Sequence, residues 1–195
     1  MASRNNANAA PSGRGSPRPA ATSVDTLIGV RLTVVLGRLL VLDDVRLSGA
    51  DAEAVCGAGM ATTADLSPGA HRVRVRQGLY VAVHAYLRRH LPGPGWTFVG
   101  SDVRVGGLRA DLVWRTADRS AVRIDEIKLV VPGGPLTEAL LRQLASYARA
   151  YAATGECRVE IRLVTIAHPE RSRTFAAAEL AARGTHPLAA PGALA

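Results

Sequence analysis

Residues 121–131, AVRIDEIKLVV, are the stretch that decides the fold of this 195-residue chain. The segment is apolar except for Arg123, Asp125, Glu126 and Lys128, which predicts a central strand. Side chains two positions apart share a face of a strand, so Glu126 and Lys128 lie together among apolar neighbours. A carboxylate and an ammonium placed there are costly to desolvate unless they pair or bind something. The stretch therefore predicts either a buried ion pair or a functional site.

Lys128 is the only lysine among the 24 basic residues, all the others being arginine. A lysine ammonium can lose its proton in a suitable environment, whereas an arginine guanidinium cannot, so the two are not interchangeable. On the preceding extended segment, Asp111 interrupts the apolar run LRADLVWR. If the two segments pair around a turn at Asp118-Arg119, Asp111 falls near Glu126, slightly offset. Two carboxylates and one lysine would then converge.

This convergence suits metal-assisted hydrolysis of a phosphodiester. Two oxygen ligands with open positions for water and phosphate suit Mg²⁺, and Mn²⁺ accepts the same ligands. The ion would generate the nucleophile and neutralise charge, and Lys128 would position or deprotonate the attacking water. The alternative is a buried Glu126–Lys128 ion pair without a catalytic role.

Outward from this stretch, the pattern predicts an α/β (α+β) domain with a central mixed sheet flanked by helices. A helix over 78–91 precedes an antiparallel meander of three strands, and a helix, a strand and a short helix follow it. The predicted ranges after the first helix are 97–105, 108–115 and 121–131 for the meander, 135–153 for the helix, 158–168 for the strand and 175–183 for the last helix.

The N-terminal part predicts an additional β-hairpin over 25–47, with its turn at Gly37-Arg38 between two β-branched and Leu-rich runs. Residues 1–23 are polar and Arg-bearing and predict a disordered basic tail. A single domain over 24–183 and a flexible C-terminal tail over 184–195 complete the expected organisation.

The composition indicates a packed globule with a mildly basic character. Hydrophobic residues make up 48% and the net charge is +8, which favours a polyanionic partner such as DNA. The chain shows neither a signal peptide nor an apolar run long enough to cross a bilayer, so we expect a cytoplasmic protein without a membrane partner. The oligomeric state stays open between a monomer and a homodimer.

Asp111, Glu126 and Lys128, in this order and with a helix before and after the three strands, resemble the PD-(D/E)XK nuclease superfamily over about 77–168. Gln143 and Tyr147 are similar to the Q-x-x-x-Y motif of its RecB-like branch. The resemblance implies a restriction-endonuclease-like core and catalytic roles for these five residues. It also implies that Asp111, Glu126, the Ile127 carbonyl and His84 bind Mg²⁺ or Mn²⁺. The chain has only two cysteines, which excludes the four-cysteine iron–sulfur cluster of some relatives.

Three of these residues also have a purely structural interpretation. Gln143 can be a partly exposed boundary residue, although a glutamine on the apolar side of a helix must find polar partners. Tyr147 can be a core residue. His84 can be a boundary histidine of an amphipathic helix rather than a metal ligand.

The resulting hypothesis is a Mg²⁺- or Mn²⁺-dependent deoxyribonuclease that binds phosphates through arginines. The alternatives are a catalytically silent nucleic-acid-binding or assembly module with the nuclease fold, a nuclease acting on RNA, and a hydrolase of another phosphate ester. The arginines expected to contact nucleic acid are Arg104, Arg109, Arg142 and Arg149, with Arg88 and Arg89 on the first helix.

Overall fold

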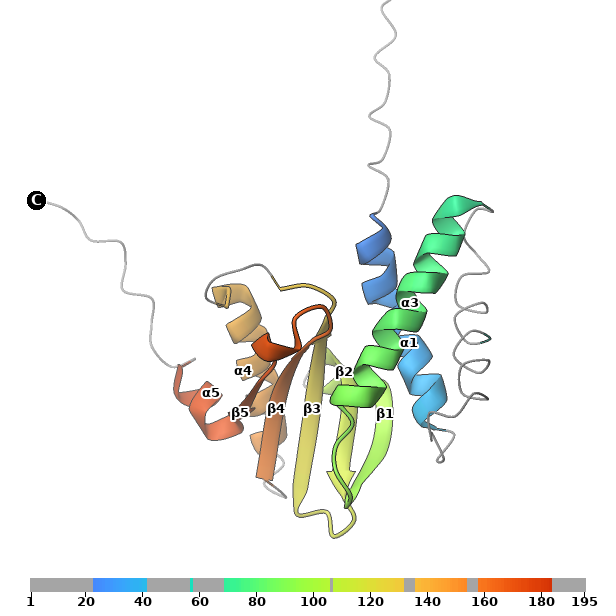
Figure 1. The fold of residues 1–195 in the computed structure, drawn as a ribbon. Coiled ribbons are helices and arrows are strands. Elements are labelled where there is room, and N and C mark those ends of the chain that lie inside the picture. Colours follow the sequence, from blue (N-terminus) through green and yellow to red (C-terminus); the bar gives the residue numbers. More distant parts are fainter. Residues whose placement is uncertain are drawn as a thin grey trace, which may run out of the picture.

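A five-stranded mixed sheet forms the centre of the protein in the computed structural model (Figure 1). The structure describes residues 23–41, 57, 69–105, 107–131, 136–153 and 158–183. The strands follow one another across the sheet in chain order, so that β3 is the central strand. They are β1 (Trp96–Val105), β2 (Leu108–Thr116), β3 (Ala121–Lys128), β4 (Arg158–Thr165) and β5 (Arg173–Ala176).

The predicted antiparallel meander is confirmed. β1 pairs with β2 and β2 with β3, both antiparallel, and Leu112 lies opposite Asp125 in the second pair. β3 pairs with β4 in parallel. A parallel pair needs a crossover connection, and the helix α4 (Glu138–Ala152) lies in that connection. β3 therefore has neighbours on both edges.

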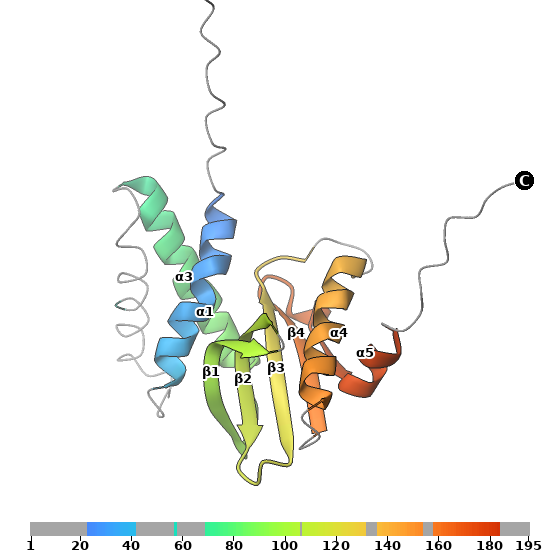
Figure 2. The ribbon, with the colours of Figure 1, turned by 180° about the vertical axis from the view of Figure 1, so that it is seen from behind.

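Helices cover both faces of the sheet, as Figures 1 and 2 show from opposite sides. The helices α1 (Val24–Leu40) and α3 (Ala70–Arg89) share one apolar core with Leu112, Trp114, Ile127 and Val164 of the sheet. On the other face, α4 and α5 (Ala177–Arg183) pack with Val113, Ile124 and Leu163. β3 is thereby buried on both sides, which explains its nearly continuous apolar sequence.

The predicted N-terminal hairpin is wrong, because residues 24–40 form the helix α1. Its buried side chains recur at helical spacing, at Ile28, Leu32, Val35, Leu36, Leu39 and Leu40. Ser23 caps the helix by accepting the N–H of Thr26 at 3.1 Å. Gly37, which the hairpin prediction placed in a turn, lies inside the helix where a Cβ would overlap the Ser101 side chain of β1. Residues 42–47 lie outside the described part.

The other predicted elements are present with shifted ends. α3 begins eight positions before the predicted residue 78, and the predicted helix over 175–183 starts only after the short strand β5, which the sequence pattern did not predict. A one-turn 3₁₀-helix, Pro169–Arg171, separates β4 from β5. Residues 1–22 of the predicted N-terminal tail and all of the predicted C-terminal tail lie outside the described residues, as do Cys56, Pro135 and Cys157. Among the described helices, none combines the length and apolarity needed to cross a membrane.

We expect Gly37→Ala to destabilise the protein although alanine is the better helix former. The added methyl group collides with Ser101, and overpacking of this kind costs about 1–3 kcal/mol. Gly29→Ala in the same helix is the control, because nothing lies within 4 Å of its added Cβ. There we expect a gain of up to about 1 kcal/mol from helix propensity. Urea unfolding of the two variants measures both effects, and equal stabilisation would contradict the close contact between α1 and β1.

Candidate active site

The Glu126 carboxylate is the centre of a cluster of four residues that the sequence predicted for the site. Glu126 lies on the α4 face of β3 and is only 2% exposed. The Nζ atom of Lys128 lies 2.6 Å from its Oε1. Gln143 Nε2 donates to the same oxygen at 2.9 Å, and the Tyr147 hydroxyl lies 3.0 Å from Oε2. These contacts confirm the prediction that Glu126 and Lys128 share a face and that Gln143 finds polar partners there.

The helix α4 positions Gln143 and Tyr147 together because residues four apart lie on one side of a helix. Gln143 Nε2 also lies 3.1 Å from the Tyr147 hydroxyl. That hydroxyl is 2.5 Å from the carbonyl oxygen of Arg109 in β2. Burial, and next the Glu126 carboxylate, raise the pKa of Tyr147 well above its usual range, so its hydroxyl stays protonated. The Q-x-x-x-Y pair therefore connects α4 to both β2 and β3.

Asp111 lies beside this cluster on β2. β2 and β3 pair as far as Leu112 and Asp125, and Asp111 and Glu126 are the next residues of the two strands beyond that pair. Its Oδ2 accepts the backbone N–H of Ile127 at 2.7 Å. Burial, and next the negative charge of Glu126, raise the pKa of Asp111 to about 6, against the opposing effect of the Ile127 N–H and the Lys128 ammonium. Two carboxylates are thus held close enough to repel each other.

A groove of about 480 Å³ opens over Asp111 and Lys128 between α1 and the end of β3. Its walls are formed by the first turns of α1 and the residues that follow β3. Ile127 also borders the groove, which fits the predicted role of its carbonyl. Asp111 and Lys128 therefore line an open surface, while Glu126 is not among the residues that line the groove.

Asp111 and Glu126 are the residues of this site that could hold a Mg²⁺ or Mn²⁺ ion. Mg²⁺ usually binds through one or two carboxylates and keeps several waters, and Asp111 and Glu126 supply two carboxylates beside an open groove. The mutual repulsion of these carboxylates, expressed in the raised pKa of Asp111, is what a divalent cation would relieve.

His84 is not brought into this cluster. No three His, Cys, Asp or Glu side chains of the described residues lie close enough together to hold a metal ion. His84 lies on α3 with its ring centroid 4.4 Å from that of Tyr80. The helical pattern that placed His84 on α3 does not fix which side of the helix meets the sheet, and the buried face of α3 presents Tyr86 instead.

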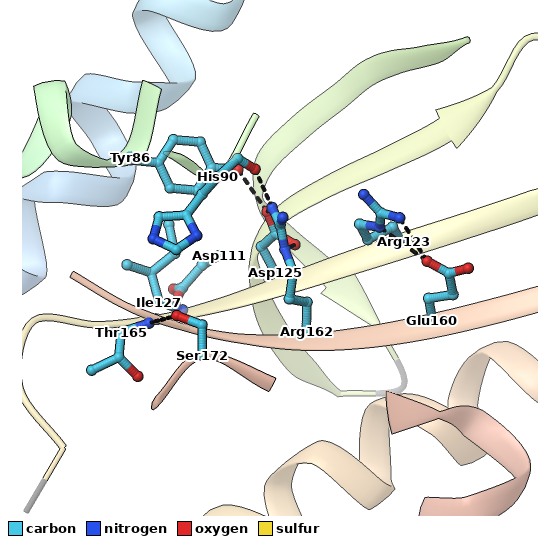
Figure 3. Close-up of polar contacts among 10 residues, drawn as sticks. All are labelled: Tyr86, His90, Asp111, Arg123, Asp125, Ile127, Glu160, Arg162, Thr165 and Ser172. Atoms are coloured by element: carbon cyan, nitrogen blue, oxygen red, sulfur yellow. Dashed lines mark hydrogen bonds and ion pairs between the residues drawn. The ribbon is translucent and has the colours of Figure 1, made fainter. Parts of the chain in front are cut away.

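A second polar network lies on the opposite face of β3, around Asp125 (Figure 3). Asp125 is fully buried, and Arg162 of β4 binds both of its oxygens, with Nε 2.8 Å from Oδ1 and Nη2 on Oδ2. The Tyr86 hydroxyl donates to Oδ2 at 2.6 Å, and Arg162 also donates to the carbonyl oxygen of His90. Burial, and next the charge of Arg162, lower the pKa of His90. This network fixes the end of α3 to β3 and β4.

The four arginines predicted to contact nucleic acid are all exposed, but their environments differ. Arg109 forms an ion pair with Asp102, and an Arg149 Nη atom lies 3.0 Å from the Ser146 hydroxyl. Arg104 lies opposite Arg109 on the β1–β2 pair. Arg142 is adjacent to Gln143 on α4 and is therefore the nearest of the four in sequence to the Glu126 cluster.

The α1 wall of the groove was missed by the sequence interpretation. Asp25, Thr26, Gly29 and Val30 line it, and the Thr33 hydroxyl lies 3.4 Å from Asp111 Oδ1. The hairpin prediction for this segment removed these residues from consideration. Ser23 before an apolar pattern at helical spacing was the signal that could have found them.

We expect Arg162→Met to lower the free energy of unfolding by about 3–5 kcal/mol, because it leaves the Asp125 carboxylate buried without its cation. Arg158→Met on the same strand is the matched control. Arg158 is exposed and pairs with Glu160, which Arg123 also binds, so its loss should cost at most about 1 kcal/mol. Urea unfolding at neutral pH measures both free-energy changes. Similar losses would show that the Asp125 network contributes no more to stability than the Arg158–Glu160 ion pair.

Asp111→Asn should stabilise the protein at pH 7.5 by about 1–3 kcal/mol while removing a predicted metal ligand. Because the pKa of Asp111 is raised to about 6, the native state binds more protons than the unfolded chain between about pH 4 and pH 6. The free energy of unfolding of the wild type therefore falls as pH rises through this window, and the full destabilisation is reached above it. The asparagine keeps an oxygen for the Ile127 N–H and cannot ionise.

Chemical unfolding of both proteins at pH 4 and pH 7.5 measures the difference, which should shrink at the lower pH. Added Mg²⁺ should raise the melting temperature of the wild type and have no effect on Asp111→Asn, since only a ligand that binds the native state stabilises it. A stability difference that does not change with pH would show that ionisation of Asp111 does not destabilise the native state.

Comparison of the chain with protein-family models, with curated proteins and with solved structures finds no match. The resemblance to PD-(D/E)XK nucleases rests on the residues of the Glu126 cluster, Asp111 and the order of the elements around them.

Proposed function

We propose that the protein is a metal-dependent nuclease that hydrolyses phosphodiester bonds of DNA on a restriction-endonuclease-like core. The observation that carries the proposal is the Glu126 carboxylate, on which Lys128, Gln143 and Tyr147 converge. Asp111 adds a second carboxylate beside it. Glu126 and Lys128 of β3, Gln143 and Tyr147 of α4, and Asp111 of β2 thus form one site. A purely structural ion pair between Glu126 and Lys128 would not require the other three residues.

In this proposal Asp111 and Glu126 hold Mg²⁺ or Mn²⁺, with the Ile127 carbonyl as a further ligand. The bound ion supplies positive charge that acidifies a water molecule and offsets the charge of the phosphate. The Ile127 N–H fixes the Asp111 carboxylate, while Gln143 and Tyr147 fix that of Glu126. Both carboxylates are therefore oriented before substrate arrives, which reduces the cost of reorganisation during the reaction.

Lys128 acts on the attacking water. Its side chain is 36% exposed and borders the groove, so its ammonium reaches solvent while Glu126 holds it from below. An ammonium in this position can orient the attacking water by donating a hydrogen bond to it. The exposed arginines, Arg142 first, would bind phosphates flanking the scissile bond.

The alternative of a catalytically silent binding module keeps the same fold and the same arginines. It does not explain why the only lysine of the chain lies on the buried carboxylate, where an arginine could form the pair equally well. We therefore favour the enzyme.

Lys128→Arg tests this choice. The variant keeps the positive charge and the ion pair with Glu126, so we expect a folded protein that still binds DNA and metal. Its metal-dependent cleavage should fall on the order of 10²-fold or more, because the planar guanidinium cannot place a single N–H donor on the water as the compact ammonium does. The assay follows cleavage of labelled single-stranded and double-stranded DNA and of RNA with Mg²⁺ or with EDTA, beside the melting temperature.

Full activity of the folded variant would remove Lys128 from the mechanism. DNA binding without Mg²⁺-dependent cleavage by the wild type would favour the silent module. Faster cleavage of RNA than of DNA would replace the proposed substrate.

A further inference from the structure

Lys128 also borders a second cavity, on the other side from the α1 groove. This pocket of about 270 Å³ lies between the residues that follow β3 and the first turns of α4. Its lining consists of Lys128, Val130, Val131, Thr137, Ala139, Leu140 and Gln143. Val130 is 52% exposed and borders both cavities. A phosphate held at Lys128 would therefore have a separate cavity on each side of it.

The two cavities differ in charge. The α1 groove contains two carboxylates, Asp25 and Asp111, whereas none of the described residues that line the α4 pocket is acidic. The carboxylate groove suits a cation and its waters, and it repels the phosphates of a nucleic-acid strand. The side chains that line the α4 pocket are aliphatic apart from Lys128, Thr137 and Gln143, so the pocket suits an uncharged, largely apolar group attached to a phosphate.

Gln143 gives this pocket a hydrogen-bond acceptor. Both hydrogens of its Nε2 are occupied, by Glu126 Oε1 at 2.9 Å and by the Tyr147 hydroxyl oxygen at 3.1 Å. Its Oε1 has no hydrogen-bond partner among the residues that the structure describes, and Gln143 borders the pocket. The Thr137 hydroxyl already accepts the N–H of Leu140 at 3.3 Å, as the cap of α4. A planar group that donates an N–H from its edge fits this arrangement.

We propose that the α4 pocket holds the base of an unpaired nucleotide next to the phosphate at Lys128. Every nucleobase carries an N–H donor on its Watson–Crick edge, and this edge is free only when the base is unpaired. Small-molecule sites typically measure about 300–1,000 Å³, so a pocket of 270 Å³ accepts one nucleoside rather than a duplex. The inference rests on the proposed function for the identity of the phosphate. It implies a substrate with a single strand or a frayed end at the site.

Titration calorimetry with Mg²⁺ and two ligands tests the pocket without relying on cleavage. We expect a deoxynucleoside 5′-monophosphate to bind at least tenfold more tightly than deoxyribose 5-phosphate, which lacks the base. Ala139→Phe fills the pocket from the first turn of α4 and should abolish this difference. Ala152→Phe is the matched control, since Ala152 is an exposed alanine in the last turn of the same helix that lines neither cavity. Equal binding of the two ligands by the wild type would overturn the proposal.

Cleavage of a single-stranded oligonucleotide that contains one abasic residue provides the second measurement. The bond beside the missing base should be cleaved at least tenfold more slowly than the same bond in an intact strand, and Ala139→Phe should cleave both at the slower rate. Base-dependent nucleotide binding without any DNA cleavage would support the pocket and contradict the nuclease. Cleavage that ignores both the missing base and Ala139→Phe would support the nuclease and contradict the pocket.

Discussion

Two consecutive carboxylates in the central strand set the main constraint on this structure. Asp125 and Glu126 are 0% and 2% exposed and point to opposite faces of the sheet. Each charge must be satisfied within the protein, because burying an unpaired carboxylate costs several kcal/mol. Arg162 and Tyr86 bind Asp125 on the α3 face, while Lys128 and two side chains of α4 bind Glu126 on the other. Both helix layers are therefore attached to β3 through polar contacts as well as apolar packing.

The sequence predicted the α4 face of this arrangement well. The alternation of side chains along a strand placed Glu126 and Lys128 together, and the helical spacing of Gln143 and Tyr147 placed that pair on one side of α4. The turn at Asp118-Arg119 was enough to bring Asp111 to Glu126, since a short antiparallel connection fixes the register. Local sequence patterns were sufficient here because the residues of this face lie on the consecutive elements β2, β3 and α4.

The α1 and α3 face was predicted less well, for two physical reasons. The segment 24–40 is rich in β-branched and leucine residues that fit a strand, and only its packing against α3 and the sheet shows that the helical period is the one used. The network around Asp125 joins residues 37 and 39 positions apart. No local pattern links such partners, so Arg162 could not be assigned from the sequence.

The place of Arg162 in the chain has a consequence for synthesis on the ribosome. Asp125 is translated 37 residues before the cation that compensates it, and the same delay applies to β4, the parallel neighbour of β3. Until that strand emerges, the carboxylate favours hydration over burial and opposes insertion of β3 between the two helix layers. Glu126, one residue along, then has no fixed position either. We therefore expect the central sheet to close only after the chain beyond residue 165 has left the exit tunnel, so that the Glu126 cluster forms late in synthesis.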